Sequence, residues 1–302
     1  MLALSKIQQR ILDLKRKKNA VILAHNYQIP EIQDIADHVA DSLELAQKAQ
    51  ITDADSIVFC GVHFMAESAK ILNPKKKVLL PSLQAGCFMA NMITPEALIA
   101  KKREHPDATV VTYINSSAAV KAESDIIVTS ANAVKICRQI PNKKILFTPD
   151  EHLGGFVAEQ IPEKEFIFWK GFCYIHTRLL AEKVMAAALA HPEAIVIAHP
   201  ECPREIRQLA HHVCGTGAMI RYARESPATE FLIATEPGMT YRLQKELPAK
   251  KFWNLCIECL NMKQITLEKL LAALEEEQYE ITVPQATAVK AKQALDKMLK
   301  MS

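Results

Sequence analysis

The sequence has 302 residues, of which 49% are hydrophobic and 24% charged, and its formal net charge is +3. This composition is close to that of an average soluble globular protein, so it excludes a disordered, collagen-like or disulfide-scaffold chain. The weak, evenly spread charge argues against nucleic-acid binding, and at roughly 150 residues per domain the length favours two domains.

The apolar segments are short. None reaches the roughly 18 residues that span a membrane, and residues 1–20 form a charged amphipathic segment rather than a signal peptide. We therefore expect a cytoplasmic protein without membrane contact, whose eight cysteines are not paired in disulfides. The eight glycines form neither a dinucleotide-binding motif nor a P-loop. Any phosphate must therefore be bound without a Gly-rich loop.

Short apolar runs alternate with amphipathic segments along the whole chain. Strands are predicted over 20–24, 56–60, 77–80, 109–113, 125–128, 145–148, 166–169, 194–198, 231–234 and 252–254. Helices are predicted over 31–39, 43–50, 66–72, 95–104, 131–138, 177–190, 205–212, 239–247 and 267–276, and a last one over 285–300. This alternation is typical of an α/β protein with parallel sheets covered on both faces.

The chain contains an internal repeat. Residues 21–27 (VILAHNY) align with 109–115 (TVVTYIN) and with 195–201 (IVIAHPE), at offsets of 88 and then 86 residues. The alignment makes His25, Tyr113 and His199 equivalent. The same offsets relate three further sets: Tyr27, Asn115 and Glu201; Ser42, Ser130 and Thr216; Phe59, Phe147 and Ile233. Chance alignment of strands does not require polar matches, so we predict three copies of one α/β unit rather than two unrelated domains.

The predicted units span residues 1–86, 87–172 and 173–284, and the helix within 285–302 is expected to pack back on the first. Cys87, Cys173 and Cys259 lie 86 residues apart, each after the last strand of its copy. Functional residues of parallel sheets lie beyond the carboxyl ends of the strands, so three units around a pseudo-threefold axis would bring these thiols to one point. Three thiolates are one short of the usual four for a [4Fe–4S] cluster. One iron would then stay open as a Lewis acid.

The other equivalent sets would gather around the same point. Ser42, Ser130 and Thr216 are predicted at or just before helix starts, where hydroxyls and free N–H groups can bind an anion. Helix capping alone would explain any one of them, but three together predict a pocket for carboxylates or phosphate. Glu201 is the only carboxylate in these sets. With His199, His25 and Tyr27 it supplies the candidates for proton transfer.

Blocks spread over the chain resemble the quinolinate synthase family, the A protein of the bacterial and archaeal NAD pathway. These blocks are AHNYQIPEIQDIADHVADSLELA (24–46), GVHFMAESAKILNPKKKVLLP (61–81), AGCFMANM (85–92), TYINSSAAVKAESDIIVTSANAVKI (112–136), WKGFCYIH (169–176), AHPECPREIRQLA (198–210), GTGAMI (215–220), TEPGM (235–239) and CLNMK (259–263). The resemblance implies three similar three-layer αβα domains around a pseudo-threefold axis.

It also implies a [4Fe–4S] cluster held by one cysteine from each domain, which the motifs assign to Cys87, Cys173 and Cys259. The implied reaction condenses iminoaspartate with dihydroxyacetone phosphate to quinolinate, phosphate and water. An aspartate oxidase or dehydrogenase would supply the unstable iminoaspartate. The implied active-site positions are His25, Tyr27, Ser42, Tyr113, Asn115, Ser130, His199, Glu201 and Thr216. Glu201, Tyr27 and His199 are the leading acid/base candidates, and the hydroxyls with Tyr113 and Asn115 would bind the carboxylates and the phosphate.

The sequence departs from the family pattern at three places. Ala40 stands where the family usually has Gly, Asn26 replaces a common aromatic residue, and the loop before Thr216 lacks a serine often found there. Two alternatives stay open. One is an aconitase-like hydro-lyase, which also uses three cysteines and an open iron. The other is a non-catalytic redox or metal-sensing module built on Cys256 and Cys259, the chain's C-x-x-C pair, which in some relatives forms a regulatory disulfide.

Overall fold

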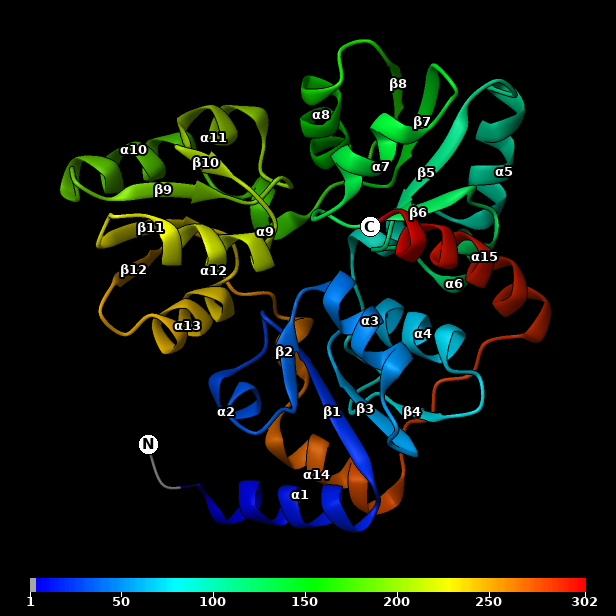
Figure 1. Cartoon of the computed structure of the whole chain (residues 1–302), viewed down its shortest axis with the longest axis vertical. Coiled ribbons are helices and arrows are strands. Elements are labelled where there is room, and N and C mark those ends of the chain that lie inside the picture. Colours follow the sequence, from blue (N-terminus) through cyan, green and yellow to red (C-terminus); the bar gives the residue numbers. More distant parts are fainter. Residues whose placement is uncertain (1–3) are drawn as a thin grey trace.

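A computed structural model describes residues 4–302 and contains three parallel sheets of four strands each. The first sheet has the order β2-β1-β3-β4, the second β6-β5-β7-β8 and the third β10-β9-β11-β12. The strands are β1 (Ala20–His25), β2 (His38–Ala40), β3 (Ser56–Cys60), β4 (Lys77–Leu79), β5 (Thr109–Tyr113), β6 (Ile126–Val128), β7 (Lys144–Thr148), β8 (Glu165–Phe168), β9 (Ile195–Ala198), β10 (His212–Val213), β11 (Glu230–Ala234) and β12 (Lys251–Asn254). The predicted α/β fold of three similar units is confirmed, and the units surround a common centre (Figure 1).

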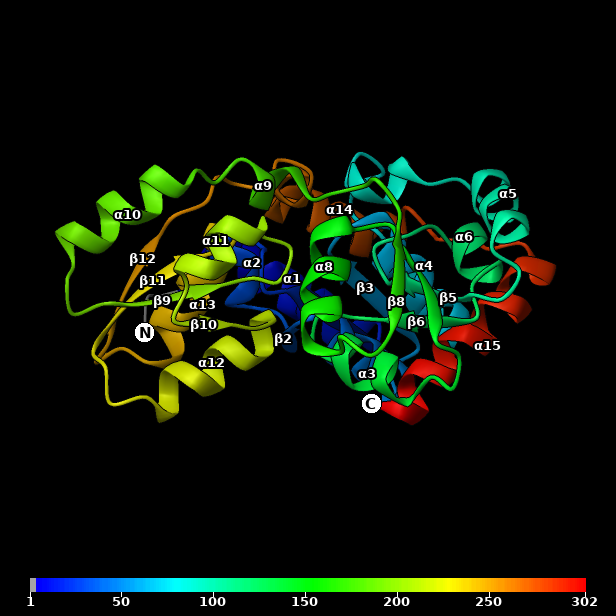
Figure 2. The same ribbon diagram turned by 90° about the horizontal axis from the view of Figure 1, so that it is seen from above.

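Equivalent helices cover the three sheets. They are α1 (Lys6–Lys17), α2 (Pro30–Gln33), α3 (Ser42–Ile51) and α4 (His63–Leu72) in the first unit; α5 (Pro95–Glu104), α6 (Ala118–Ala122), α7 (Ala133–Gln139) and α8 (Glu151–Gln160) in the second; and α10 (Ala181–Ala190), α11 (Arg204–Leu209), α12 (Thr216–Glu225) and α13 (Pro237–Glu246) in the third. Helices α5 and α10 lie on opposite outer flanks of the molecule (Figures 1 and 2). No helix within residues 4–302 combines the length and the apolar character needed to cross a membrane.

Each sheet is followed by a short helical turn, and two further helices end the chain. The turns are η1 (Met89–Met92), α9 (Tyr174–Thr177) and η2 (Met262–Gln264), and they follow Cys87, Cys173 and Cys259 respectively. The last helices are α14 (Leu267–Glu276) and α15 (Gln285–Met301). The three candidate ligands thus occupy matching positions between a last strand and a helical turn.

Two edge strands were predicted as parts of helices, and this prediction is wrong. The predicted helices 31–39 and 205–212 are only α2 and α11, and the chain then extends into β2 and β10. Ile32, Ile35 and Val39 repeat at helical spacing, but pairing with the central strand overrides this pattern, as in the register His25 with Ala40. The predicted helix 177–190 is also interrupted, because Leu180 is extended and separates α9 from α10.

The end of the chain returns to the first two units. Helix α14 packs against α1 and β3 of the first unit, and Leu80 and Tyr279 then exchange backbone hydrogen bonds. Helix α15 packs against α6 and β6 of the second unit and against α4 of the first (Figure 1). The predicted range 173–284 therefore includes α14, whose buried side chains contact the first sheet. The exact unit boundaries stay a prediction.

Candidate functional site

One cavity lies where strand ends of the three units meet. The cavity has a volume of about 80 Å³. All of the predicted site residues line it: His25, Tyr27, Ser42, Cys87, Tyr113, Asn115, Ser130, Cys173, His199, Glu201, Thr216 and Cys259. No lysine or arginine between residues 4 and 302 lines this cavity. A bound anion would therefore depend on hydroxyls, backbone groups or a metal.

Close contacts between loops hold the three units together at this cavity. A Cβ atom added to Gly215 of the third unit would lie 2.8 Å from Oγ of Ser130 in the second, so a larger residue there would displace the Ser130 hydroxyl. Nδ2 of Asn26 in the first unit donates a hydrogen bond to Oγ1 of Thr216 at 3.0 Å. Because Asn26 occupies an acceptor position of this hydroxyl, Thr216 keeps its own proton for a ligand.

The equivalent hydroxyls are not the caps of their helices. The Asp41 carboxylate caps α3 by accepting from two backbone N–H groups, so Ser42 is the first helical residue. The N-cap of α12 is Gly215, and Thr216 follows it. Ser130 lies in the loop before α7, which begins at Ala133 rather than at the predicted residue 131. Helix capping therefore does not explain why these hydroxyls are present.

Glu201 is buried at the centre of a polar cluster. Its Oε1 accepts a hydrogen bond of 2.5 Å from the Tyr113 hydroxyl. Its Oε2 lies 2.8 Å from Nδ1 of His176, a contact at ion-pair distance that lacks hydrogen-bond alignment. The rings of His176 and His199 stack with centroids 4.8 Å apart. A carboxylate from the third unit is thus held by a phenol from the second and by the turn that follows Cys173.

Two equivalent histidines have the same tautomer. Nδ1 of His25 accepts the Tyr27 backbone N–H at 3.2 Å, and Nδ1 of His199 accepts the Glu201 backbone N–H at 3.3 Å. The ring proton of each therefore sits on Nε2. Burial lowers the pKa of His25 to about 4 and that of His199 to about 3. Both rings are neutral at pH 7 and can donate a hydrogen bond from Nε2.

The cavity shifts the pKa of the Glu201 carboxyl group and the pKa of the Tyr27 and Tyr113 phenols in opposite directions. Burial alone would raise the pKa of Glu201, but the neighbouring His176 and His199 and the hydrogen bond from Tyr113 hold it below its usual range. Burial and the Glu201 charge raise the pKa of Tyr27 and Tyr113 well above that of a free phenol. At neutral pH the cavity therefore contains an ionised carboxylate beside protonated phenols, which is a pairing of a base with acids.

A chain of polar contacts connects Tyr27 with Glu201. The Tyr27 hydroxyl lies 2.6 Å from Oγ1 of Thr235, which lies 2.9 Å from Nε2 of His176. His176 then contacts Glu201 through its other ring nitrogen. The repeat does not indicate His176 or Thr235, because the residues at the equivalent positions of the other copies are not comparable. Both occur within the family-like blocks WKGFCYIH and TEPGM, which could have indicated them.

The three thiols fit an iron–sulfur cluster. Cys87, Cys173 and Cys259 are free, partly buried and face the same cavity from three units, and no fourth cysteine of the described chain lines it. Burial raises the pKa of Cys87 to about 12 and raises the pKa of Cys173 and Cys259. These thiols therefore stay protonated at neutral pH, and a metal that binds them would remove their protons. By contrast, Cys256 packs in the apolar core of the third unit beside Leu232.

Comparison with known proteins gives matches over almost the whole chain. The model of the family described as "Quinolinate synthetase A protein" matches residues 9–300. A quinolinate synthase from Caldicellulosiruptor saccharolyticus is 52% identical over 301 residues, which cover 99% of each chain. One from Alkaliphilus metalliredigens is 51% identical over 290 residues, covering 95% of this chain and 96% of the relative. Quinolinate synthase 1 from Methanosarcina acetivorans is 51% identical over 295 residues, covering 96% of each.

Proposed function

The chain belongs to the quinolinate synthetase A family, and from this membership we propose that it condenses iminoaspartate with dihydroxyacetone phosphate to quinolinate, phosphate and two waters in NAD biosynthesis. The observation that carries the proposal is the meeting of three thiols from three units beside the Glu201 cluster in one cavity. The match over residues 9–300 argues against an aconitase-like hydro-lyase. The position of Cys256 in an apolar core argues against a module built on the C-x-x-C pair.

Cys87, Cys173 and Cys259 would hold a [4Fe–4S] cluster. Since the cavity offers three cysteine ligands, one iron would remain without a cysteine ligand. When bound, the cluster supplies a Lewis acid that polarises substrate oxygen or nitrogen. The protein's part is to keep the three thiols at one point and to present that iron to the cavity rather than to bulk water.

The substrates carry carboxylates and a phosphate, and we assign these groups to the hydroxyl-rich side of the cavity. Ser42 and Thr216 begin helices of ten residues, whose N-termini favour negative charge. Ser130, Tyr113 and Asn115 line the same cavity. The hydrogen bond from Asn26 keeps Thr216 as a donor toward a ligand.

Glu201 is the proposed base. The carboxylate lines the cavity and is ionised at pH 7, so it can take a proton from the substrate during condensation and ring closure. Through His176 and Thr235 the contacts continue to Tyr27, whose protonated phenol can return a proton to a leaving oxygen. Neutral His25 and His199 orient the substrate through their Nε2–H groups. Tyr113 holds the Glu201 carboxylate in place.

Anaerobic purification with iron and sulfide analysis tests the proposal, together with an assay of quinolinate from dihydroxyacetone phosphate and freshly generated iminoaspartate. We expect about four iron and four sulfide per chain and quinolinate formation. An iron-free, inactive anaerobic protein would refute the proposal. Because iminoaspartate is unstable, we expect a cytoplasmic aspartate oxidase or dehydrogenase to supply it.

A further inference from the structure

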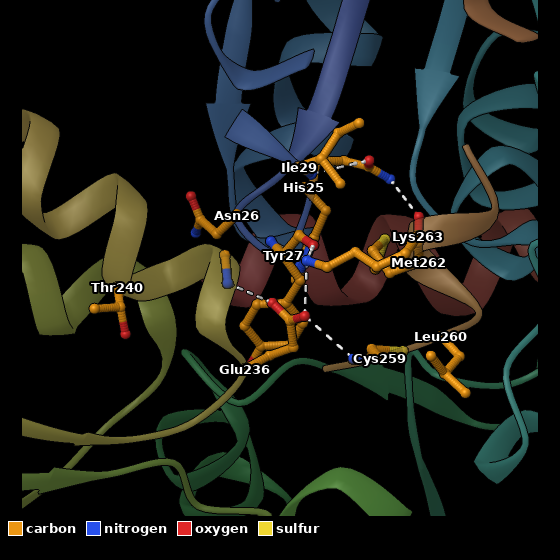
Figure 3. Close-up of polar contacts among 12 residues, drawn as sticks. His25, Asn26, Tyr27, Ile29, Glu236, Thr240, Cys259, Leu260, Met262 and Lys263 are labelled. Atoms are coloured by element: carbon orange, nitrogen blue, oxygen red, sulfur yellow. Dashed lines mark hydrogen bonds and ion pairs between the residues drawn. The ribbon is translucent and has the colours of Figure 1, made fainter. Parts of the chain in front are cut away.

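A buried ion pair lies just outside the cavity, between the third unit and the turn after Cys259. Glu236 is fully buried and precedes α13, and its Oε1 lies 2.7 Å from Nζ of Lys263 in η2 (Figure 3). Neither residue lines the cavity. The cavity residues therefore do not explain why a carboxylate lies in the interior, where an unpaired charge is costly, beside a lysine whose side chain is only 15% exposed.

Glu236 connects the loop of a candidate cluster ligand with the start of a helix. Its Oε1 also accepts the backbone N–H of Cys259 at 3.1 Å, and its Oε2 accepts the backbone N–H of Gly238 at 2.6 Å. Hydrogen bonds to an ionised acceptor are roughly twice as strong as those between neutral groups. The carboxylate thus fixes the Cys259 backbone relative to α13.

Lys263 connects the same turn with the first unit. Its Nζ donates to the backbone carbonyl of Tyr27 at 2.6 Å, as Figure 3 shows. Nearby, Nε2 of Gln28 donates to the carbonyl of Met262 at 2.9 Å. The first unit also approaches α13 closely, because a Cβ atom on Gly238 would lie 2.7 Å from the carbonyl carbon of Tyr27. One ammonium group thus lies between the Tyr27 segment and the Glu236 carboxylate.

We propose that Glu236 and Lys263 are positioning residues that fix the Cys259 loop toward the cluster and the Tyr27 segment toward the substrate at the same time. This inference rests on the proposed function, which gives Cys259 its role as a cluster ligand and Tyr27 its role as an acid. Independently of that function, the Glu236–Lys263 ion pair connects the third unit with the first. Removing either partner leaves the other charge buried without its counter-ion, and the loop loses a hydrogen-bonded anchor.

The apoprotein gives a test that does not depend on a bound cluster. Mass spectrometry would follow the anaerobic alkylation of Cys259 relative to that of Cys87 in the same molecule. We expect the ratio of the two rates to rise at least fivefold in Lys263→Met and in Glu236→Gln. The two substitutions change the local charge in opposite directions, so a purely electrostatic effect on the thiol would move their rates oppositely. Release of the Cys259 loop should instead raise the alkylation rate of Cys259 in both variants.

Lys245→Met is the matched control. Lys245 and Asp34 also form an ion pair between α13 and the first unit, at 2.5 Å, but their side chains are 42% and 33% exposed. We expect this variant to keep the wild-type ratio within twofold. An unchanged ratio in both Lys263→Met and Glu236→Gln would overturn the proposal. So would global unfolding, which exposes both cysteines and raises both rates together.

The holoprotein supplies the second measurement. Under anaerobic conditions, iron loss to a chelator should be at least tenfold faster in Lys263→Met than in wild type, and kcat per bound cluster should fall. The double variant Glu236→Gln/Lys263→Met removes both charges, so its effect should be smaller than the two single effects combined. Additive effects would contradict the pairing. If wild type itself takes up no iron while the alkylation ratios change, the proposed function fails and the positioning role stands.

Discussion

Glu201 receives contacts from side chains that come from different parts of the chain. Tyr113 ends β5, His176 lies in the turn after Cys173, and His199 follows β9. At pH 7 burial keeps His25 and His199 neutral, whereas Glu201 is ionised. Burial alone would raise the pKa of Glu201, and its polar neighbours keep the carboxylate ionised in spite of this.

Glu201→Gln should lower kcat by about 10²–10⁴-fold, which is the usual contribution of a general base. Iron content should stay at the wild-type level, because the three thiols are untouched. The measurement is anaerobic quinolinate formation normalised to bound iron. Glu205→Gln, at an exposed position on α11, is the control. A Glu201→Gln enzyme with wild-type kcat would remove Glu201 from the chemistry.

His25 gives a prediction on the pH dependence of stability. Its pKa of about 4 in the folded protein lies below the ordinary value of 6.5, so the unfolded chain binds more protons between these values. Stability therefore rises with pH in this window, by up to about 1.4 kcal/mol per pH unit. Above pH 6.5 the contribution is constant.

Urea unfolding of the apoprotein would measure this as the difference in unfolding free energy between wild type and His25→Gln. The difference is needed because Asp150 and Glu236 have raised pKa values and titrate with the opposite sign. We expect the wild type to lose stability relative to His25→Gln as the pH falls from 6.5 toward 4. A difference that does not vary with pH would show that His25 is not a buried neutral ring.

The proposed ligand cysteines and the core cysteines should differ in what their removal does. Cys87→Ala and Cys173→Ala should each lose most of the bound iron, because each removes one of the three proposed thiol ligands. Cys256→Ala should keep it, since Cys256 packs in an apolar core. Anaerobic iron and sulfide analysis decides between these outcomes. The opposite pattern would favour a metal module on the C-x-x-C pair.

The strands that could be predicted are those with continuous apolar runs. All ten predicted strands exist, with ends displaced by at most one residue. β2 and β10 were missed because they are three and two residues long and form only by pairing with β1 and β9. Their existence was nevertheless implied by the repeat, since β6 was predicted at the equivalent position. For β2 and β10, pairing with a neighbouring strand outweighs the local sequence pattern.

The same limit applied to the site. Residues that recur in each copy could be found from one sequence, and the structure brings the three polar sets and the three cysteines to one cavity. Residues used only once, such as His176 and Thr235, leave no trace in the repeat. Their importance comes from contacts between units, which depend on the three-dimensional arrangement. A repeat therefore reveals the symmetric part of a site and hides the asymmetric part.

Helix α15 should contribute to stability through its buried face. Leu295 is fully buried in the core shared with α4 and α6, so Leu295→Ala should lower the unfolding free energy by about 2–5 kcal/mol. Val289 on the same helix is 50% exposed, and Val289→Ala should cost less than about 1 kcal/mol. Urea unfolding checks both. Equal effects would show that α15 does not contribute through packing.

The cavity belongs to no single unit, because each unit supplies one thiol and one hydroxyl-bearing loop. An iron without a cysteine ligand should be attacked by oxygen. We expect exposure to air to remove iron and activity together, and saturating quinolinate to slow this loss by covering the cavity. Absorbance and iron content against time in air measure it. A cluster and activity unaffected by air would contradict the open iron.

Helix α14 has a consequence for the order in which the chain folds during synthesis. Its side chains Leu270, Ala273 and Leu274 are buried against the first unit, beside α1 and β3. Domains usually fold as they leave the ribosome, starting at the N-terminus. Helix α1 packs against β1, but the part of β3 that α14 covers stays exposed until residues 267–276 have been made. We therefore expect the growing chain to depend on chaperones until its end, and the cluster to be inserted only after release.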